Sequence, residues 1–471
     1  MNAHAPDQFP NNAKEALQDA TLRKALRSAT DLFAERRKNA LAQVPDWEAL
    51  RDRAAAIKQE VLADLPAHVD RFAAAATAAG CVVHRAKDAA EACAIVAKLA
   101  HERSAKRLVK SKSMATEEIH LNHALEAAGA EPIETDLGEW IIQLAGETPS
   151  HIIVPAIHKT REAIGQLFVD KLGIEPTSDP QRLAAHAQQR LRAHFAAADL
   201  GISGANFAIA ETGTILILEN EGNARMTTTL PKTHVAVIGI EKVIPRFADL
   251  EVFLKLLPRS GTGQHLTSYQ SLLTGPDRGG QGPQELHIVL LDNGRSKIAQ
   301  DAVMRQTLAC IRCGACLNAC PVYQSVGGHA YGSVYPGPIG AILSPQLHGG
   351  EAATKLPFAS SLCGACKDVC PVKIDIPTLL LELRQRAMQK PGQTKWVERV
   401  GWRLWAWSMA GPRRYALATA MARLLQRLPL LDRVAPPLAA WRSSRELPRA
   451  AARPFRSTFA ARPHGHGGGG T

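Results

Sequence analysis

Apolar residues recur at helical spacing along the start of the chain. The segment "VPDWEALRDRAAAIKQEVLADL" begins around Asp46, a favourable N-cap residue, and stops before Pro66. The following segment, "PAHVDRFAAAATAAG", starts with proline and ends at Gly80, which is the usual asymmetry of a helix. The pattern therefore predicts a helical N-terminal region over residues 1–79.

From residue 80 the pattern changes to short, continuous apolar runs. These runs are "CVVHRA", "RLVKSK", "HIIVPAI", "NFAIAET", "TILILEN", "HVAVIGI" and "ELHIVLLDN". Because they are rich in β-branched residues and bounded by turn residues, they indicate strands buried on both faces of a largely parallel sheet. Within that sheet, "NFAIAETGTILILEN" predicts an antiparallel hairpin that turns around Gly213. An α/β domain is expected over residues 80–299.

A break in composition separates this hairpin from the last strand. The stretch "LPRSGTGQHLTSYQSLLTGPDRGGQGPQE" is rich in Gly, Ser and Pro and predicts a long ordered loop. A helix in "DNGRSKIAQDAVMRQTLA" is then expected to lead into a cysteine-rich domain over residues 300–390. A Trp- and Arg-rich segment fills residues 391–471, and its last residues, "HGHGGGGT", are of low complexity and expected to be disordered.

Length and cysteine usage limit the class of protein. A chain of 471 residues has room for two or three domains and a core that needs no covalent staples. Seven of the nine cysteines fall in two short stretches, "CIRCGACLNACP" and "SSLCGACKDVCP". Such clustering indicates metal ligands in a reducing compartment rather than disulfides. The N-terminus carries no apolar signal region and the chain has no long apolar run, so a cytoplasmic protein is expected.

The net charge of +12 is concentrated at the end of the chain. Residues 391–471 contain thirteen Arg and one Lys against three acids. This basic segment is open to three interpretations: contact with an acidic partner, contact with anionic lipid, or the Arg-rich surface of a high-GC bacterial proteome. Nucleic-acid binding is not expected, because its most charged part has little aromatic interleaving.

An apolar stripe precedes the most basic part of this segment. Val397, Val400, Leu404 and Trp407 would share one face of a helix. Such a stripe can lie on a membrane surface. We favour the alternative, in which it packs on its own domain or on a partner subunit.

The two cysteine motifs carry the strongest chemical signal in the chain. The spacing Cys-x2-Cys-x2-Cys-x3-Cys-Pro is that of bacterial-type 4Fe–4S binding, in which the fourth cysteine ligates a different cluster. The closing proline is expected to end the loop and block further helix. Zinc would require two paired Cys-x2-Cys knuckles and gives these prolines no role. Reciprocal ligation assigns Cys310, Cys313, Cys316 and Cys370 to cluster 1, and Cys320, Cys363 and Cys366 to cluster 2.

Cluster 2 thus has three protein thiolates, because Ser360 stands where the first motif has Cys310. Its open corner could take Ser360 or Ser361 oxygen, water or a residue of a partner, or be absent in a 3Fe–4S cluster. Three-cysteine ligation suits a cluster that binds an exogenous group or passes electrons to one. We favour an ordinary relay cluster, completed by serine or by a ligand from another segment.

Several stretches together resemble the lactate-utilisation protein B family. The cysteine region, "VKSKSMATEEIHLN", "ETDLGEWIIQLAGETPSHIIVPAIHKTR", "AIAETGTILILENEGNARMTTTLPKTHVAVIGIEKVIP" and "ELHIVLLDNGRS" carry the resemblance, which covers residues 45–390. It implies a LUD domain with a sugar-phosphate-isomerase/CoA-transferase-like α/β fold, followed by an α-helical ferredoxin-like domain with two 4Fe–4S clusters. The family's second motif is also one cysteine short.

The resemblance also implies a role and partners. Family members act in oxidation of L-lactate to pyruvate, together with a cysteine-rich redox subunit and a second LUD protein. The chain lacks a G-x-G-x-x-G turn after a strand, a P-loop and a flavin signature. Since clusters pass single electrons, we expect electron relay, with any catalytic centre shared with another subunit. Alternatives are a relay for glycolate or another 2-hydroxy acid, and a redox-sensing, ligand-binding or transferase-like module.

Polar residues that follow the expected strands are candidates for binding a small hydroxy acid, because ligands of open α/β sheets lie beyond the carboxyl ends of the strands. Ser113 could begin a helix whose N-terminus favours an anion. His158 is the candidate general base, with Glu211 as a weaker catalytic candidate. Alternatively, all of these are ordinary loop residues. The binding candidates are Lys110, Lys112, Ser113, Lys159, Asn220, Asn223 and Arg225.

Overall fold

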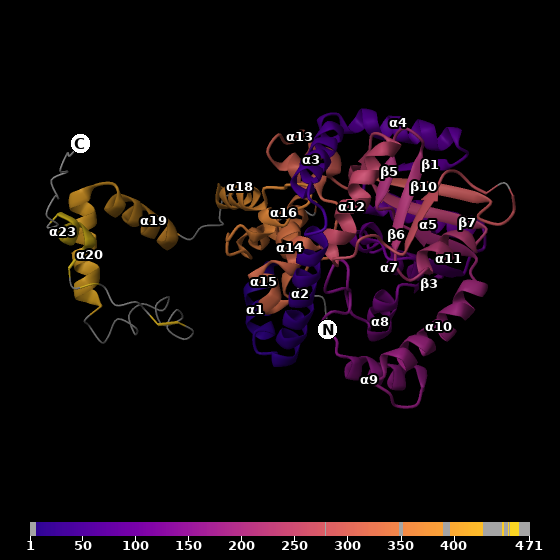
Figure 1. Cartoon of the computed structure of the whole chain (residues 1–471), viewed down its shortest axis with the longest axis horizontal. Helices are drawn as coiled ribbons and strands as arrows, with labels where there is room; N and C mark the ends of the chain where they lie inside the picture. The colour runs from indigo at the N-terminus through magenta and orange to yellow at the C-terminus, as the bar shows by residue number, and fades with distance from the viewer. Residues whose placement is uncertain are drawn as a thin grey trace, which may run out of the picture. The chain divides into compact units, whose positions relative to one another are not determined.

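The computed structural model describes residues 6–277, 279–347, 352–389, 396–426, 445–446, 451 and 453–460 (Figure 1). The chain divides into two compact units, Met1–Ala387 and Met388–Thr471. The C-terminal residues "HGHGGGGT", for which disorder was expected, lie outside the described residues.

The first unit begins with the predicted helices. Asp46 precedes α3, but its side chain makes no capping hydrogen bond. Asp64 caps α4, because its Oδ1 accepts a hydrogen bond from the Ala67 N–H at 3.3 Å. The N-terminal elements are η1 (Pro6–Gln8), α1 (Phe9–Ala16), α2 (Ala20–Leu41), α3 (Trp47–Ala63) and α4 (Leu65–Ala78).

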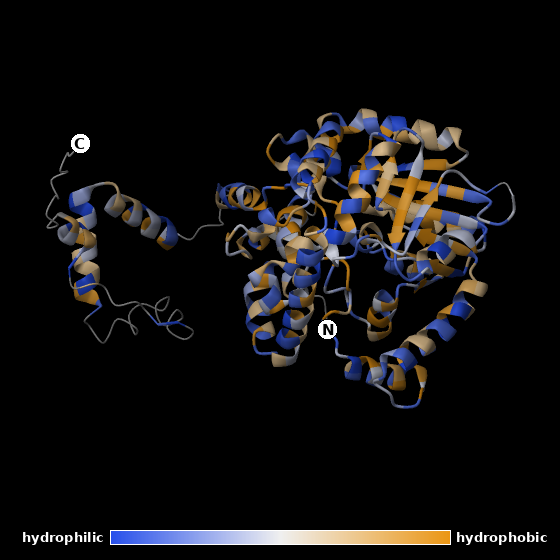
Figure 2. Cartoon of the chain, in the orientation of Figure 1, coloured by the Kyte–Doolittle hydropathy of each residue, from blue (hydrophilic) through white to orange (hydrophobic). Residues whose placement is uncertain are grey.

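A six-stranded parallel sheet forms the centre of the first unit, in the order β1-β10-β7-β4-β2-β3. It confirms the parallel sheet expected from the apolar runs, and Figure 2 shows that its strands are largely hydrophobic. Its short strands β3 and β4 were not predicted. The strands are β1 (Val82–Ala86), β2 (Arg107–Lys110), β3 (Glu131–Glu134), β4 (Leu200–Ser203), β7 (Thr233–Gly239) and β10 (Glu285–Leu291).

Helices cover both faces of this sheet. Helices α3 and α4 pack against Ala236, Ile238 and Ile288 on one face. Helices α5 and α7 pack against Val235 and Val237 on the other. The helices between β1 and the cysteine region are α5 (Ala89–Glu102), α6 (Met114–Glu118), α7 (Leu121–Ala127), α8 (Leu137–Ala145), α9 (Arg161–Leu172), α10 (Pro180–Ala196), α11 (Asn223–Thr229), η2 (Ile240–Lys242), η3 (Phe247–Asp249), α12 (Leu250–Gly261) and α13 (Arg295–Gln300).

The predicted hairpin forms, but in a second sheet. Strands β5 (Phe207–Ile209) and β6 (Thr214–Glu219) pair antiparallel within a four-stranded sheet of order β8-β5-β6-β9. The expectation that it belongs to the parallel sheet was wrong. Only three residues join β4 to β5, which is too short a connection to cross over and return in parallel to the same sheet.

Two further expectations were wrong. The run "HIIVPAI" forms turns instead of a strand, because the His151 Nδ1 accepts hydrogen bonds from the N–H groups of Ile153 and Val154 and folds the backbone on itself. The expected long loop contains the end of α12 and the strand β9 (Tyr269–Leu273), which pairs with β6. The second sheet is completed by β8 (Val243–Ile244).

The cysteine region is built from short helices around the two motifs. Pro321 is the first residue of α15 and therefore begins a helix, contrary to the expectation that it blocks one. Proline fits this position because the first N–H of a helix needs no partner. The elements are η4 (Met304–Ala309), α14 (Ala315–Asn318), α15 (Pro321–Val326), η5 (His329–Tyr331), α16 (Gly337–Leu347), η6 (Ala352–Phe358), α17 (Ala365–Asp368) and α18 (Ile376–Gln389).

The cysteine region shares a hydrophobic core with the rest of the first unit. Leu50 and Ile57 of α3 pack in one cluster with Phe253 of α12 and with Leu317 and Ile342 of the cysteine region. The boundaries expected at residues 79/80, 299/300 and 390/391 stay predictions.

The second unit contains α19 (Trp396–Met409), α20 (Pro412–Leu425) and α23 (Phe455–Ala460). The stripe on α19 is exposed: the exposed fractions of Val397, Leu404 and Trp407 are 59 %, 62 % and 53 %. No helix among the described residues is long and apolar enough to cross a membrane.

Candidate iron–sulfur and substrate sites

The two cysteine motifs adopt the same backbone conformation. Arg312 and Leu362, each directly before the second cysteine position, have left-handed φ angles of 60° and 56°. Gly314 and Gly364 follow those cysteines with φ of 72° and 90°, and each opens a four-residue helix. Left-handed backbone suits glycine but is costly for arginine or leucine, so the surrounding structure holds both loops in place.

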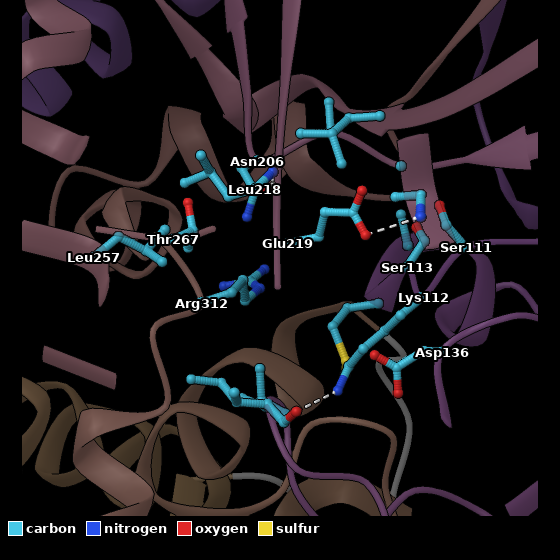
Figure 3. A pocket seen from close by; sticks show the side chains of 18 of the residues that line it. Ser111, Lys112, Ser113, Asp136, Asn206, Leu218, Glu219, Leu257, Thr267 and Arg312 are labelled. Atoms are coloured by element: carbon cyan, nitrogen blue, oxygen red, sulfur yellow. Dashed lines mark hydrogen bonds between the residues drawn. The ribbon is translucent and has the colours of Figure 1, made fainter. Parts of the chain in front are cut away.

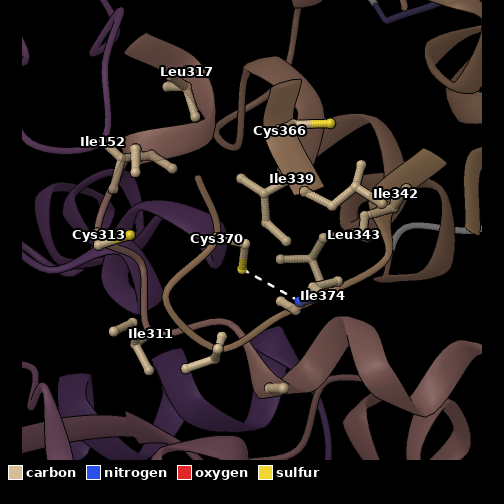
Figure 4. Packing of buried hydrophobic residues seen from close by; sticks show 14 of the residues in the cluster. Ile152, Ile311, Cys313, Leu317, Ile339, Ile342, Leu343, Cys366, Cys370 and Ile374 are labelled. Atoms are coloured by element: carbon tan, nitrogen blue, oxygen red, sulfur yellow. Dashed lines mark hydrogen bonds between the residues drawn. The ribbon is translucent and has the colours of Figure 1, made fainter. Parts of the chain in front are cut away.

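Four cysteines surround one apolar cavity. Cys310, Cys313, Cys316 and Cys370 line it together with isoleucines such as Ile339. Figure 4 shows Cys313, Cys370 and Ile339 among the buried side chains of this region. Burial raises the pKa of the Cys370 thiol to about 11, and the neighbouring charge of Cys310 acts in the same direction. These are the four residues that the spacing assigns to cluster 1.

The other three cysteines form a second group, nearer the surface. Burial raises the pKa of Cys366 to about 12, and the charges of Cys320 and Cys363 contribute to this shift. Cys363 is exposed, and hydrogen bonds from the Ala365 N–H and the Ser361 hydroxyl lower the pKa of its thiol. The described residues contain no group of three His, Cys, Asp or Glu side chains suited to a single metal ion.

Ser360 takes the same local position as Cys310. The Arg312 N–H donates to the Cys310 Sγ at 3.4 Å, and the Leu362 N–H donates to the Ser360 Oγ at 3.1 Å. The Ser360 Oγ therefore has the same position in the second loop as the Cys310 Sγ has in the first loop. Ser360 is also held from outside, because the Arg384 guanidinium donates to its carbonyl at 3.1 Å.

Hydrogen-bond donors surround several of the sulfurs. The Ile374 N–H donates to the Cys370 Sγ at 3.4 Å. Burial raises the pKa of Cys320, and the N–H groups of Tyr323 and Val322, followed by the nearby Tyr331 hydroxyl, act against it. This buried hydroxyl has no other hydrogen-bond partner among the described residues. Donors of this kind stabilise negative charge on sulfur and thereby tune a cluster's potential.

A cavity of about 280 Å³ lies at the carboxyl edge of the parallel sheet (Figure 3). Its lining includes Ser111 after β2, Gly204 after β4 and Gly239 at the end of β7, as expected for an open α/β sheet. The cysteine region closes its other side with Arg312 and Tyr335.

Four of the predicted substrate residues line this cavity. The Lys112 Nζ donates to the Ile153 carbonyl at 2.8 Å, and Ser113 caps the short helix α6. Asn220 pairs with the Gln264 amide, and the Asn223 Nδ2 donates to the Thr135 Oγ1 at 3.3 Å.

Lys110 does not reach the cavity. Its ammonium is fully buried and pairs with Glu134 at 2.6 Å and Glu117 at 3.0 Å. Burial alone would lower the pKa of Lys110, but these two carboxylates outweigh burial and raise the pKa. The side chain is therefore engaged in a structural ion pair.

The other candidates also lie elsewhere. His158 and Lys159 both contact Glu147, at 2.8 Å each, away from the cavity lining. They do not follow a strand, because the strand expected before them is absent. The Glu211 carboxylate accepts a hydrogen bond from the Phe247 N–H at 2.7 Å on the surface, and Arg225 is exposed.

The charged residues where the cavity meets the cysteine region were not predicted. The Arg295 guanidinium forms buried ion pairs with Glu118 at 2.7 Å and Glu241 at 2.5 Å, and the Arg312 guanidinium contacts Glu241 at 3.3 Å. Lys242 lines the cavity without a hydrogen-bonding partner among the described residues; burial, then the charge of Arg312, lower its pKa to about 8. Two features of the sequence could have pointed to these residues. Lys242 closely follows the strand-like run "HVAVIGI", and Arg312 lies between two cysteines of the first motif.

Comparison with known proteins agrees with this two-part construction. The LUD domain model matches residues 69–291, the 4Fe-4S dicluster domain model residues 306–374, and the model for the C-terminal part of lactate utilisation protein B residues 383–464. The molecule is thus a LUD domain followed by a 4Fe–4S dicluster domain, with a mostly helical structure around a parallel sheet.

Full-length relatives narrow this class to one family. Lactate utilization protein B of Bacillus pumilus is 43% identical over 461 residues, which cover 96% of this chain and 97% of that protein. The corresponding protein of Macrococcus caseolyticus is 43% identical, with 94% of each chain covered. The uncharacterized electron transport protein YkgF of Escherichia coli is 42% identical, with 96% of each covered. The chain belongs to the lactate utilisation protein B family.

Proposed function

We propose that this chain is the iron–sulfur electron-transfer subunit of a system that oxidises L-lactate to pyruvate. Its family membership supports the pathway, and the two cysteine groups support the redox role. The observation that carries the proposal is the contact between the two sites: Arg312 and Ile152 line both the sheet-edge cavity and the cavity of Cys310, Cys313 and Cys316.

The residues present fit two clusters. Cys310, Cys313, Cys316 and Cys370 would hold cluster 1, and Cys320, Cys363 and Cys366 would hold cluster 2. Ser360 is the proposed fourth ligand of cluster 2, because its hydroxyl has the loop position of Cys310. When bound, each cluster accepts and passes on one electron at a time.

The protein groups around the clusters set a direction for the relay. Cluster 1 would lie beside the sheet-edge cavity, whereas cluster 2 would lie near the surface at the exposed Cys363. Electrons would therefore enter near cluster 1 and leave through cluster 2 to a partner. The proposed partners are a cysteine-rich redox subunit and a second LUD protein, and the proposed compartment is the cytoplasm.

Growth of a deletion strain tests the pathway. A strain that lacks this gene should fail to grow on L-lactate and still grow on glycolate, and the wild-type gene should restore growth. The variant Cys316→Ser should not restore it. Loss of growth on glycolate alone would instead support the alternative of a relay for another 2-hydroxy acid.

A further inference from the structure

Arg312 carries unused hydrogen-bonding capacity inside the protein. Its side chain is only 6 % exposed, and its Nη2 contacts Glu241 at 3.3 Å. The Nε and Nη1 groups are buried and have no oxygen or nitrogen partner among the described residues, and the Cys310 sulfur lies beside the side chain. A buried guanidinium with unpaired donors is unfavourable unless a ligand completes its hydrogen bonds.

The neighbouring acids do not neutralise this group fully. Glu241 is shared, because its other oxygen pairs with Arg295. Arg295 is in turn held by both oxygens of Glu118, at 2.8 and 2.7 Å. Two carboxylates thus face the two arginines, and the ammonium of Lys242 adds an unpaired positive charge to the same cavity wall.

Acidic residues elsewhere in the lining are engaged with the backbone. The Glu219 carboxylate accepts hydrogen bonds from the N–H groups that begin α11, and Asp136 caps α8. Glu221 accepts a hydrogen bond from the Leu137 N–H at 3.1 Å. In Figure 3 the Arg312 side chain lies apart from Asp136 and projects into the cavity.

The backbone directs Arg312 to this place. Its left-handed φ of 60° lies between two cluster 1 cysteines, and its guanidinium packs 4.8 Å from the centre of the Tyr335 ring. The second motif has the same conformation with Leu362, which has no charge. At this position the first motif therefore carries a cation and the second does not.

We propose that Arg312 and Lys242 bind the carboxylate of a small 2-hydroxy or 2-oxo acid in this cavity. The unpaired Nη1 of Arg312 can donate a charge-assisted hydrogen bond to one carboxylate oxygen, and the ammonium of Lys242 adds a second charged contact. The acid would lie beside cluster 1. This inference rests on the proposed function and adds to it the residues that bind the acid and the cluster that the acid faces.

Direct binding to the cluster-loaded, full-length chain tests the site without partner subunits or turnover. Anaerobic calorimetry would compare L-lactate and pyruvate with L-lactamide, which lacks the carboxylate. We expect both acids to bind and the amide not to bind. Arg312→Gln and Lys242→Gln should each weaken acid binding roughly tenfold or more. Arg182→Gln, at an exposed position of α10, is the matched control and should leave binding unchanged.

Iron content measured on each variant separates binding from cluster loss. If Arg312→Gln loses iron, its binding result cannot be used, and the affinity of Lys242→Gln tests the site instead, because Lys242 lies outside the cysteine loops. Wild-type affinity in an iron-loaded Arg312→Gln or in Lys242→Gln would overturn the site, as would equal binding of L-lactamide. Absence of acid binding to the wild type overturns this site alone, whereas the proposed function fails only if lactate does not reduce the clusters in the assembled system.

Discussion

Ser360 shows how much a single side chain decides at the second cluster. Its hydroxyl accepts the same backbone hydrogen bond that the Cys310 sulfur accepts in the first motif. A hydroxyl oxygen is a harder ligand than a thiolate and binds iron less firmly. If Ser360 completes cluster 2 as proposed, that corner is the place where the cluster would lose iron or accept another ligand.

Substitution of Ser360 tests this role. Ser360→Ala should reduce iron from about eight to about seven atoms per chain after brief exposure to air, as a 4Fe–4S cluster becomes 3Fe–4S. Ser360→Cys should keep all the iron under the same exposure. Iron analysis and EPR measure both, and Ser361→Ala tests the neighbouring serine, whose hydroxyl contacts Cys363. Loss of iron in Ser361→Ala with none in Ser360→Ala would assign the corner to the other serine.

Tyr331 offers a second residue-level prediction. Its buried hydroxyl lies beside Cys320 and would stabilise the more negative, reduced form of cluster 2. Tyr331→Phe should lower the potential of that cluster by tens of millivolts, which corresponds to about 1 kcal/mol for one electron. Tyr323→Phe is matched, because its hydroxyl donates to the Ser150 carbonyl instead. Redox titration should show no shift in that control; an equal shift in both would refute a role of the Tyr331 hydroxyl.

At the scale of elements, helix α3 connects the N-terminal region to the second cysteine loop. The Arg51 guanidinium donates to the carbonyls of Cys370 and Asp368, at 2.8 and 2.9 Å, and pairs with Glu48. Asp368 is the last residue of the four-residue helix α17, where few backbone partners are available, and Cys370 follows two residues later. The N-terminal helix therefore helps to fix the loop that carries Cys370.

Removal of this contact should loosen the loop. Arg51→Met should lower the free energy of unfolding by about 1–3 kcal/mol, because buried carbonyls lose charged hydrogen bonds. It should also speed the release of iron to a chelator. Arg53→Met, exposed on the same helix, is the control. Denaturation curves and chelation rates would check this, and equal behaviour of the two variants would contradict it.

Short elements limited what the sequence could predict. The runs that became β7 and β10 were identified because each is long and apolar. The four-residue strands β3 and β4, "EPIE" and "LGIS", carry no such run. The hairpin was recognised but assigned to the wrong sheet, because a hydrophobic pattern specifies a strand and not its partner.

At the scale of the molecule, the two candidate sites differ in how far sequence reveals them. Spacing along the chain singled out the seven cysteines because cluster ligands come from short loops. The cavity is assembled from the ends of separate strands and from the cysteine loop, so only four predicted residues reached it. Arg312 was not predicted to line the cavity, because it lies between two cysteines and was treated only as part of their motif.

The first unit places a cavity and a set of cluster ligands in contact within one chain. Arg312 and Ile152 belong to the walls of both. A substrate in the cavity and cluster 1 would therefore keep a fixed separation, since the sheet, α3 and the cysteine region share one core. This arrangement suits a relay that draws electrons from a buried acid.

The most direct test of the relay is iron and sulfide analysis with EPR on anaerobically purified protein. Spectra would be taken before and after addition of L-lactate with the partner subunits. We predict about eight irons per chain and two reduced 4Fe–4S signals that grow with L-lactate. About four irons per chain, or signals that L-lactate leaves unchanged, would contradict the account.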